Sequence, residues 1–248
     1  MGSPTLVERY RRARREPGLA VLEGFHPLKH ALRFGAVVEE VAVVDPERPR
    51  ALARMLAPDI LPSLEALPLT VTPPEIFEQL APVPPRERMI ALARRPAPSL
   101  DAALASPDPA PLVLLENPTH HPNIGAAVRV AAAAGAAGLL VVGELDPWHP
   151  AALRGGVGLQ FALPVARADR LPPTDRPLIA VAPGGEPLRR ELLPPRAILA
   201  FGSERRGLSP DLLAAAQLRV GIPMRPGVSS LSLATAVAVV LYTWRGVS

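Results

Sequence analysis

The second half of the chain alternates short apolar runs with longer stretches of helical spacing. The apolar runs lie at residues 112–115, 139–142, 178–182, 198–201 and 218–222. These runs lack in/out alternation, which is typical of strands that are buried on both faces of a parallel sheet. The helical stretches lie at 124–134, 211–216 and 230–244. Because strands and helices alternate along the chain, the pattern predicts a doubly wound α/β domain.

The first part of the chain has shorter elements and carries most of the charge runs. The predicted helices lie at 6–15, 27–34, 49–56 and 75–80, and the predicted strands at 19–22, 37–44 and 89–93. Together they describe a smaller α/β unit. Prolines then crowd residues 96–111, a composition typical of a semi-rigid linker. We therefore expect an N-terminal domain over 1–95, a linker over 96–111 and a second domain over 112–248.

Polar and glycine residues gather directly after the predicted strands of the second domain. The segments concerned are 116–125, 183–186, 202–207 and 223–230. Open α/β sheets bind ligands at the carboxyl ends of their strands, so we expect a binding site where these segments meet.

The segment 123–129 suits a functional site but also has a purely structural interpretation. Asn123 can cap the helix that follows, and Gly125 keeps its first turn uncrowded. Arg129 is the only charge in this alanine-rich helix. A capped helix with one snorkelling arginine explains the same spacing.

Two later loops also allow either a functional site or a purely structural interpretation. Glu204 brings a carboxylate to the mouth of the sheet, whereas an ordinary polar loop with a turn glycine would have a similar sequence. Further on, residues 222–228 lead into an apolar helix that either Ser229 or Ser230 can cap. The body of that helix is expected to be core.

Composition excludes several classes of site. The chain has no cysteine, which excludes disulfide scaffolds, cysteine-ligated zinc, iron–sulfur clusters and thiol catalysis. Neither a dinucleotide fingerprint, nor a phosphate-binding loop, nor a nucleophile elbow is present. The histidine pairs, His26 with His30 and His120 with His121, lack a third ligand at zinc spacing, so no metal is expected.

Charge and apolar stretches bear on partners and location. The formal charge of +4 and a pI near 10.5 are compatible with a polyanionic partner, although arginine-rich composition explains part of both. The apolar stretches 126–143 and 230–244 are either divided by glycines or shorter than the ~20 residues of a membrane span. No signal-peptide pattern is visible. We therefore expect a cytoplasmic protein without a membrane partner.

The three loops together resemble the signature motifs of the SPOUT superfamily, specifically its SpoU/TrmH-type RNA ribose 2′-O-methyltransferases. The residues that carry the resemblance are 123–129 for the first motif, 202–204 with 207–209 for the second, and 222–224 with 229–231 for the third. The resemblance covers about residues 110–245. Residues 1–95 resemble, more loosely, the ribosomal-protein-like RNA substrate-binding domain found in front of such enzymes, with 22–24 as the best match.

The resemblance implies an α/β fold whose parallel sheet is threaded into a trefoil knot, a rare exception among folds. It also implies a homodimer, structured RNA (tRNA or rRNA) as substrate, and S-adenosylmethionine as the cofactor bound in the knot. The implied cofactor-binding residues are Val181, Ala182, Gly202, Ile222, Met224 and Leu231.

The resemblance also assigns roles in methyl transfer. A ribose hydroxyl is a poor nucleophile and must be polarised and aligned with the methyl donor. Arg129 is similar to the family residue that stabilises the developing alkoxide or engages the adjacent phosphate. Glu204 and Ser230 would position cofactor or nucleotide, and Asn123 would shape the RNA pocket.

The chain departs from the family pattern at two positions and leaves two other functions open. Ser232 stands where the family usually has asparagine, and Arg205 where it often has glycine. An RNA-binding homologue with weak or no methyl transfer is one alternative, and a nucleotide- or metabolite-binding α/β enzyme is the other. The basic helix supports RNA binding both for the methyltransferase and for the RNA-binding homologue. Its arginines are Arg9, Arg11, Arg12, Arg14 and Arg15.

Overall fold

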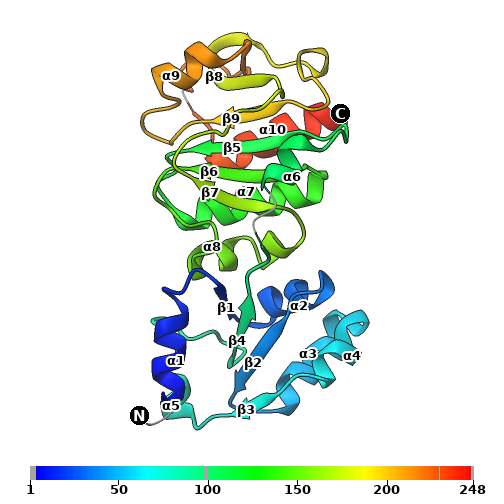
Figure 1. Ribbon diagram of the computed structural model, residues 1–248, viewed down its shortest axis with the longest axis vertical. Helices are drawn as coiled ribbons and strands as arrows, with labels where there is room; N and C mark the ends of the chain where they lie inside the picture. The colour runs from blue at the N-terminus through cyan, green and yellow to red at the C-terminus, as the bar shows by residue number, and fades with distance from the viewer. Residues whose placement is uncertain (1–3, 98–99, 229, 247–248) are drawn as a thin grey trace. The chain divides into compact units, whose positions relative to one another are not determined.

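A computed structural model of the protein describes residues 4–97, 100–228 and 230–246 (Figure 1). The chain divides into two compact units. The first unit contains residues 1–97 together with 148–162, and the second contains 98–147 together with 163–248. Residues 148–162, which the sequence pattern placed inside the second domain, therefore pack with the first unit.

The second unit is built on a parallel six-stranded sheet in the order β10-β8-β9-β5-β6-β7. All pairings in it are parallel. The strands are β5 (Leu112–Glu116), β6 (Gly138–Val142), β7 (Val165–Ala168), β8 (Leu178–Pro187), β9 (Ile198–Phe201) and β10 (Leu218–Gly221). The predicted α/β class and the five predicted strands are confirmed. The edge strand β7 was missed because it is short and its burial alternates, with Arg167 exposed.

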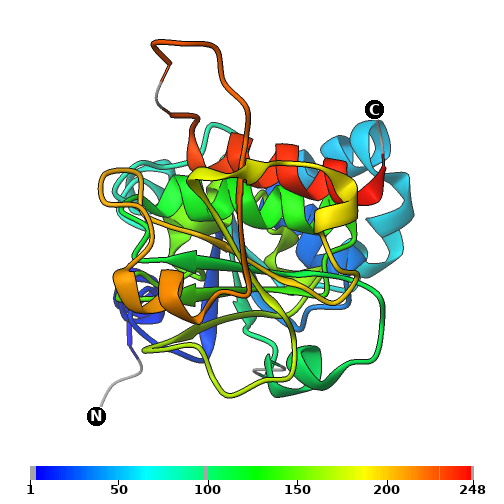
Figure 2. The same cartoon turned by 90° about the horizontal axis from the view of Figure 1, so that it is seen from above.

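Helices cover both faces of this sheet. The helices are α6 (Leu100–Ala105), α7 (His121–Ala134), α9 (Pro210–Ala215) and α10 (Leu233–Arg245), with a 3-10 turn, η3, at Arg190–Leu192. Figure 2 shows α7 in green and α10 in red side by side on one face, with α9 in orange on the other. On the α9 face, Leu104 of α6 packs with buried side chains of four neighbouring strands, among them Leu112, Leu140, Ile198 and Ala200.

The segment 96–111 is not simply a linker, because α6 lies within it. Ala103 and Leu104 of α6 are buried against the sheet. The guanidinium of buried Arg176 donates to the carbonyl oxygens of Leu104 at 2.9 Å, Ala103 at 2.7 Å and Ala110 at 2.8 Å. Burial lowers the pKa of Arg176. The prolines flank α6 rather than interrupt it, so they did not prevent the helix.

Arg176→Met is expected to destabilise the protein by about 3 kcal/mol, because buried carbonyl groups lose their charged donor. Urea unfolding measures the change. Arg170→Met replaces an exposed arginine of the same unit and is expected to shift stability by less than about 0.5 kcal/mol. Equal effects of the two substitutions would contradict the anchoring role of Arg176.

The first unit has a four-stranded sheet in the order β1-β4-β2-β3. Strand β4 (Met89–Arg94) runs antiparallel to β1 (Leu19–Glu23) and β2 (Val38–Val43), while β3 (Leu69–Val71) is parallel to β2. The helices are α1 (Leu6–Ala13), α2 (Phe25–Arg33), α3 (Glu47–Leu56), α4 (Leu61–Glu65), α5 (Pro74–Phe77) and α8 (Pro150–Gly155), with 3-10 turns η1 (Pro58–Ile60) and η2 (Leu159–Phe161). The three predicted strands are confirmed, and β3 and α4 were missed.

Helix α1 packs through its apolar side and begins at a capping box formed by Thr5 and Glu8. Its Tyr10 is fully buried and donates a hydrogen bond to the carbonyl of Ile90 at 3.0 Å. Two arginines of this segment are engaged inside the unit, since Arg9 pairs with Glu40 and the C-cap residue Arg14 pairs with Glu23, each at 2.7 Å. The helix therefore presents fewer unpaired cations than its sequence indicated.

Residues 148–162 are held on the first unit by polar contacts. The side chain of Glu23 is 3% exposed and pairs with both Arg14 and Arg154. The ring of His30 lies with Nδ1 2.7 Å from the carbonyl oxygen of Val157. The contacts of Arg154 with Glu23 and of Val157 with His30 join residues more than 120 positions apart, so they leave no local signal in the sequence.

In the part of the chain that the structure describes, no helix is long and apolar enough to span a membrane.

Candidate functional site

A cavity of about 400 Å³ opens where residues 181–183 of β8 meet the loops that follow β9 and β10. This size lies within the roughly 300–1,000 Å³ range of small-molecule sites. The cavity lies where two of the expected segments, 202–207 and 223–230, come together, whereas none of residues 116–125 lines it. All the residues that the resemblance assigned to the cofactor lie on its wall, namely Val181, Ala182, Gly202, Ile222, Met224 and Leu231.

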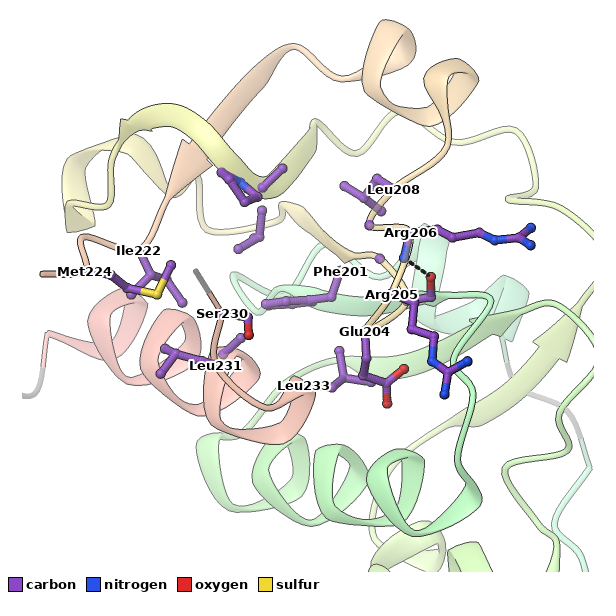
Figure 3. Close-up of a pocket in the computed structure, with 17 residues that line it drawn as sticks. Phe201, Glu204, Arg205, Arg206, Leu208, Ile222, Met224, Ser230, Leu231 and Leu233 are labelled. Atoms are coloured by element: carbon purple, nitrogen blue, oxygen red, sulfur yellow. Dashed lines mark hydrogen bonds between the residues drawn. The ribbon is translucent and has the colours of Figure 1, made fainter. Parts of the chain in front are cut away.

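The wall of the cavity has an apolar side and a polar side. Figure 3 shows Ile222, Met224 and Leu231 on one side, with Phe201 at the centre and Glu204 opposite them. The apolar side chains suit the faces of an aromatic ring or a methylene chain. The polar side comes from the loop between β9 and α9.

That loop closes on itself so tightly that it requires glycine at its first position. Ser203 donates from its backbone N–H to the carbonyl of Gly207 at 3.1 Å, and Gly207 donates back to Ser203 at 2.9 Å. A Cβ atom placed on Gly202 would lie 2.0 Å from the carbonyl carbon of Gly207. No side chain fits there, because the obstacle is backbone rather than a flexible group.

Glu204 is held by donors from the segment that leads into α7. Asn123 Nδ2 donates to its Oε1 at 2.6 Å. Thr119 donates to its Oε2 from Oγ1 at 2.8 Å and from its backbone N–H at 3.3 Å. Burial alone would raise the pKa of Glu204, but the hydrogen bonds from Asn123 and Thr119 outweigh burial and hold the pKa below its usual value. The site therefore contains a fixed, ionised carboxylate.

The structure brings Asn123 to Glu204 but corrects its expected capping role. Helix α7 begins at His121, three residues earlier than a cap at Asn123 would require, and its N-cap is His120 without a side-chain cap bond. Pro122 in the first turn favours this earlier start, because its fixed φ suits a helix N-terminus. The amide of Asn123 is therefore directed to the second motif instead of to its own helix.

Arg129 does not lie on the wall of the cavity. Its side chain is exposed on α7, whose opposite side buries Ile124, Ala127 and Val128. Within the described residues, its guanidinium has no hydrogen bond or ion pair. Of the four predicted catalytic residues, Glu204 and Ser230 line the cavity, Asn123 bonds to Glu204, and Arg129 presents an unpaired cation to solvent.

The start of α10 explains why serine can stand at position 232, where the family usually has asparagine. Ser232 is the N-cap, and its Oγ accepts from the backbone N–H of Thr235 at 3.3 Å. The expectation that Ser230 caps this helix is wrong, and Ser229 lies outside the described residues. Serine and asparagine are about equally favoured at N-caps, so serine retains this function at position 232. Ser230 is left to line the cavity.

Sequence reasoning missed two polar residues that hold the site together. One is Thr119, which binds Glu204. The other is Glu116, a buried residue whose carboxylate accepts from the backbone N–H of Ser209 at 2.7 Å and from its Oγ at 2.6 Å. Ser209 also caps α9, so Glu116 fixes the end of the loop that contains Glu204. The available signal was a carboxylate at the last position of an otherwise apolar strand.

Metal ligands do not cluster in the described residues, where no group of three or more histidine or acidic side chains is placed to hold an ion.

Comparison with known proteins gives a consistent result. The model of the SpoU rRNA Methylase family matches residues 110–242. An uncharacterized tRNA/rRNA methyltransferase of Synechocystis is 31% identical over 94% of this chain and 86% of its own length. The 23S rRNA (uridine(2479)-2′-O)-methyltransferase of Streptomyces viridochromogenes is 30% identical over 75% of this chain and 64% of its own length.

Solved structures resemble the whole chain. The SpoU methyltransferase AviRb of Streptomyces viridochromogenes, in complex with AdoMet, has a TM-score of 0.73 and 25% identity, covering 97% of this chain and 92% of its own. A structure described as an RNA 2′-O ribose methyltransferase has a TM-score of 0.73 and 27% identity, covering 98% of this chain and 97% of its own.

Proposed function

The chain belongs to the SpoU rRNA methylase family, and we propose that it transfers a methyl group from S-adenosylmethionine to a ribose 2′-hydroxyl of structured RNA, either tRNA or rRNA. It is an RNA 2′-O-methyltransferase, and S-adenosylmethionine is its cofactor. One observation carries the proposal for this chain's own site. Residues of β8 and of the loops that carry the second and third motifs line one cavity, and its carboxylate is bonded to the asparagine of the first motif.

The cavity fits S-adenosylmethionine by size and by chemistry. Ile222, Met224 and Leu231 offer an apolar surface for the adenine ring, and the absent side chain at Gly202 brings backbone groups to the edge of the cavity. Val181 and Ala182 complete the proposed binding set. The bound cofactor supplies an electrophilic methyl group on a sulfonium.

The remaining polar residues would act on the RNA. We assign to Arg129 the stabilisation of the developing 2′-alkoxide or of the adjacent phosphate, because an unpaired guanidinium is a strong donor to either. Glu204 orients Asn123, whose amide would shape the pocket for the nucleotide. Ser230 would position cofactor or nucleotide from the opposite side of the cavity.

Architecture and assembly form part of the same proposal. We propose that the C-terminal part of the second unit is threaded as a trefoil knot and that two copies form a homodimer in the cytoplasm. Close backbone packing supports the threading, since a Cβ atom on Gly185 would lie 2.7 Å from the carbonyl carbon of Arg219. Residues 1–95 are proposed to bind the RNA, with Arg11 of α1 and Arg15 just after it exposed for phosphate contacts.

The alternative is an RNA-binding homologue without methyl transfer. It arose because Ser232 stands where the family usually has asparagine. The hydrogen bond from Thr235 to Ser232 favours the enzyme, because the helix that borders the cavity keeps its cap.

Two measurements test the proposed function. Calorimetry with S-adenosylmethionine is expected to show one site per chain, and tritium from the labelled methyl group is expected to enter bulk tRNA or bulk rRNA. Cofactor binding without label in either RNA would support the binding-only alternative. Absence of cofactor binding would contradict both and favour a different α/β enzyme.

A further inference from the structure

Methyl transfer to a hydroxyl releases a proton, and the residues assigned so far offer no acceptor for it. This point rests on the proposed function. The guanidinium of Arg129 has no lone pair available at neutral pH. The carboxylate of Glu204 already accepts hydrogen bonds from Thr119 and Asn123, and these bonds oppose its protonation.

A histidine, His120, is connected to Glu204 through the hydroxyl of Thr119. His120 Nδ1 is 2.7 Å from Thr119 Oγ1, and the same ring atom is 3.9 Å from Glu204 Oε1. The side chain of His120 is 63% exposed. The ring therefore stands beside a wall residue of the cofactor cavity and remains open to solvent and substrate.

The hydrogen bonds determine which ring nitrogen of His120 has a free lone pair. Thr119 has one hydroxyl hydrogen, and it is donated to the carboxylate of Glu204, which can only accept. The short contact between Thr119 Oγ1 and His120 Nδ1 then requires that Nδ1 is the donor. In the neutral ring this leaves the proton on Nδ1 and the lone pair on Nε2.

We propose that His120 accepts the proton of the ribose 2′-hydroxyl, with Thr119 and Glu204 fixing its tautomer. The 2′-oxygen forms a bond to the methyl carbon, and the carbon–sulfur bond breaks with its electron pair retained by sulfur, so the sulfonium becomes a thioether. The hydroxyl proton passes to Nε2, and the resulting imidazolium later releases it to water. Glu204 stabilises the imidazolium through the same hydrogen-bonded chain.

Other groups near the ring do not replace His120 in this role. Within the described residues, Glu204 is the acidic side chain recorded within 4.0 Å of the ring. The neighbouring His121 is less exposed, and burial lowers its pKa while Asp146 acts in the opposite direction. Ser230 lines the cavity but carries a hydroxyl, which is too weak a base at neutral pH.

The tautomer of His120 is the first test, and it does not depend on activity. Nitrogen-15 spectra of the five histidine rings, assigned with His120→Ala, report which ring nitrogen carries hydrogen. The neutral His120 ring is expected to be protonated on Nδ1 in the wild type and to shift toward the Nε2–H form in Thr119→Val. A wild-type ring protonated on Nε2 would overturn the proposal.

Chemical rescue is the second test. His120→Ala is expected to bind S-adenosylmethionine with wild-type affinity and to transfer methyl about 100-fold more slowly in a single turnover, near the low end of general-base effects. Added imidazole is expected to restore part of that rate in proportion to its neutral form. His26→Ala, which removes an exposed histidine of the first unit, is expected to change neither rate nor imidazole response.

Each other outcome counts against the role of His120. A wild-type rate in His120→Ala, or a slow rate that imidazole does not raise, would overturn it while leaving the proposed function intact. A wild type that labels no ribose in bulk tRNA or rRNA would overturn the proposed function and this inference with it.

Discussion

Arg129→Ala is expected to lower the rate of methyl transfer by at least about 100-fold, a size typical of removing a group that stabilises developing charge. Its affinity for S-adenosylmethionine should stay within about two-fold of the wild type, because Arg129 is not on the wall of the cavity. Single-turnover kinetics and calorimetry measure the two effects separately. Arg129→Lys should recover part of the rate, since it keeps the charge and loses the planar fork of donors.

Arg170→Ala is the matched control for Arg129, because it removes an exposed arginine of the same unit that lies outside the three loops. It is expected to leave the single-turnover rate unchanged. Full activity in Arg129→Ala, or an equal loss in both variants, would contradict the role assigned to Arg129.

Gly202→Ala is expected to weaken cofactor binding by more than tenfold and to destabilise the protein by about 1–3 kcal/mol, the usual range for an overpacked site. The added Cβ would lie 2.0 Å from Gly207 C and 2.2 Å from Leu208 N, so the loop that forms one wall of the cavity must move. Calorimetry and thermal unfolding measure these effects.

Gly135→Ala separates backbone strain from the clash at Gly202. Gly135 is left-handed with φ 73° at the C-cap of α7, yet a Cβ there meets nothing within 4 Å. This variant should lose about 1 kcal/mol of stability through backbone strain, with unchanged affinity for the cofactor. If Gly202→Ala bound the cofactor as tightly as Gly135→Ala does, the turn at Gly202 would not form a wall of the cofactor cavity.

The strands of the second unit were predictable because burial on both faces requires continuous apolar runs, as in residues 112–115 and 198–201. The edge strand β7 was not, since an edge position tolerates Arg167 and leaves no such run. Helix α6 was not predicted because the prolines around it indicated a linker. The packing of 148–162 on the first unit depends on the distant pair of Glu23 with Arg154, which no local pattern records.

The candidate site divides in the same way. Most of the cavity-lining residues lie in loops whose glycines and polar residues stand out locally, and Glu204 could be placed there from its position after a buried strand. The partners of Glu204 could not, because Thr119 and Asn123 reach it across more than 80 positions. Asn123 was expected to cap α7, but a helix start at His121 turns its amide toward Glu204 instead.

The chemical position of the transferred methyl group decides whether this site methylates the ribose 2′-oxygen. RNA labelled by the wild type from S-adenosylmethionine is hydrolysed in alkali, which cannot cleave next to a methylated 2′-oxygen. We expect the label in an alkali-stable dinucleotide, and we expect Arg129→Ala to yield almost none. Label recovered in single nucleotides, which places the methyl group on a base, would contradict ribose 2′-O-methylation by this site.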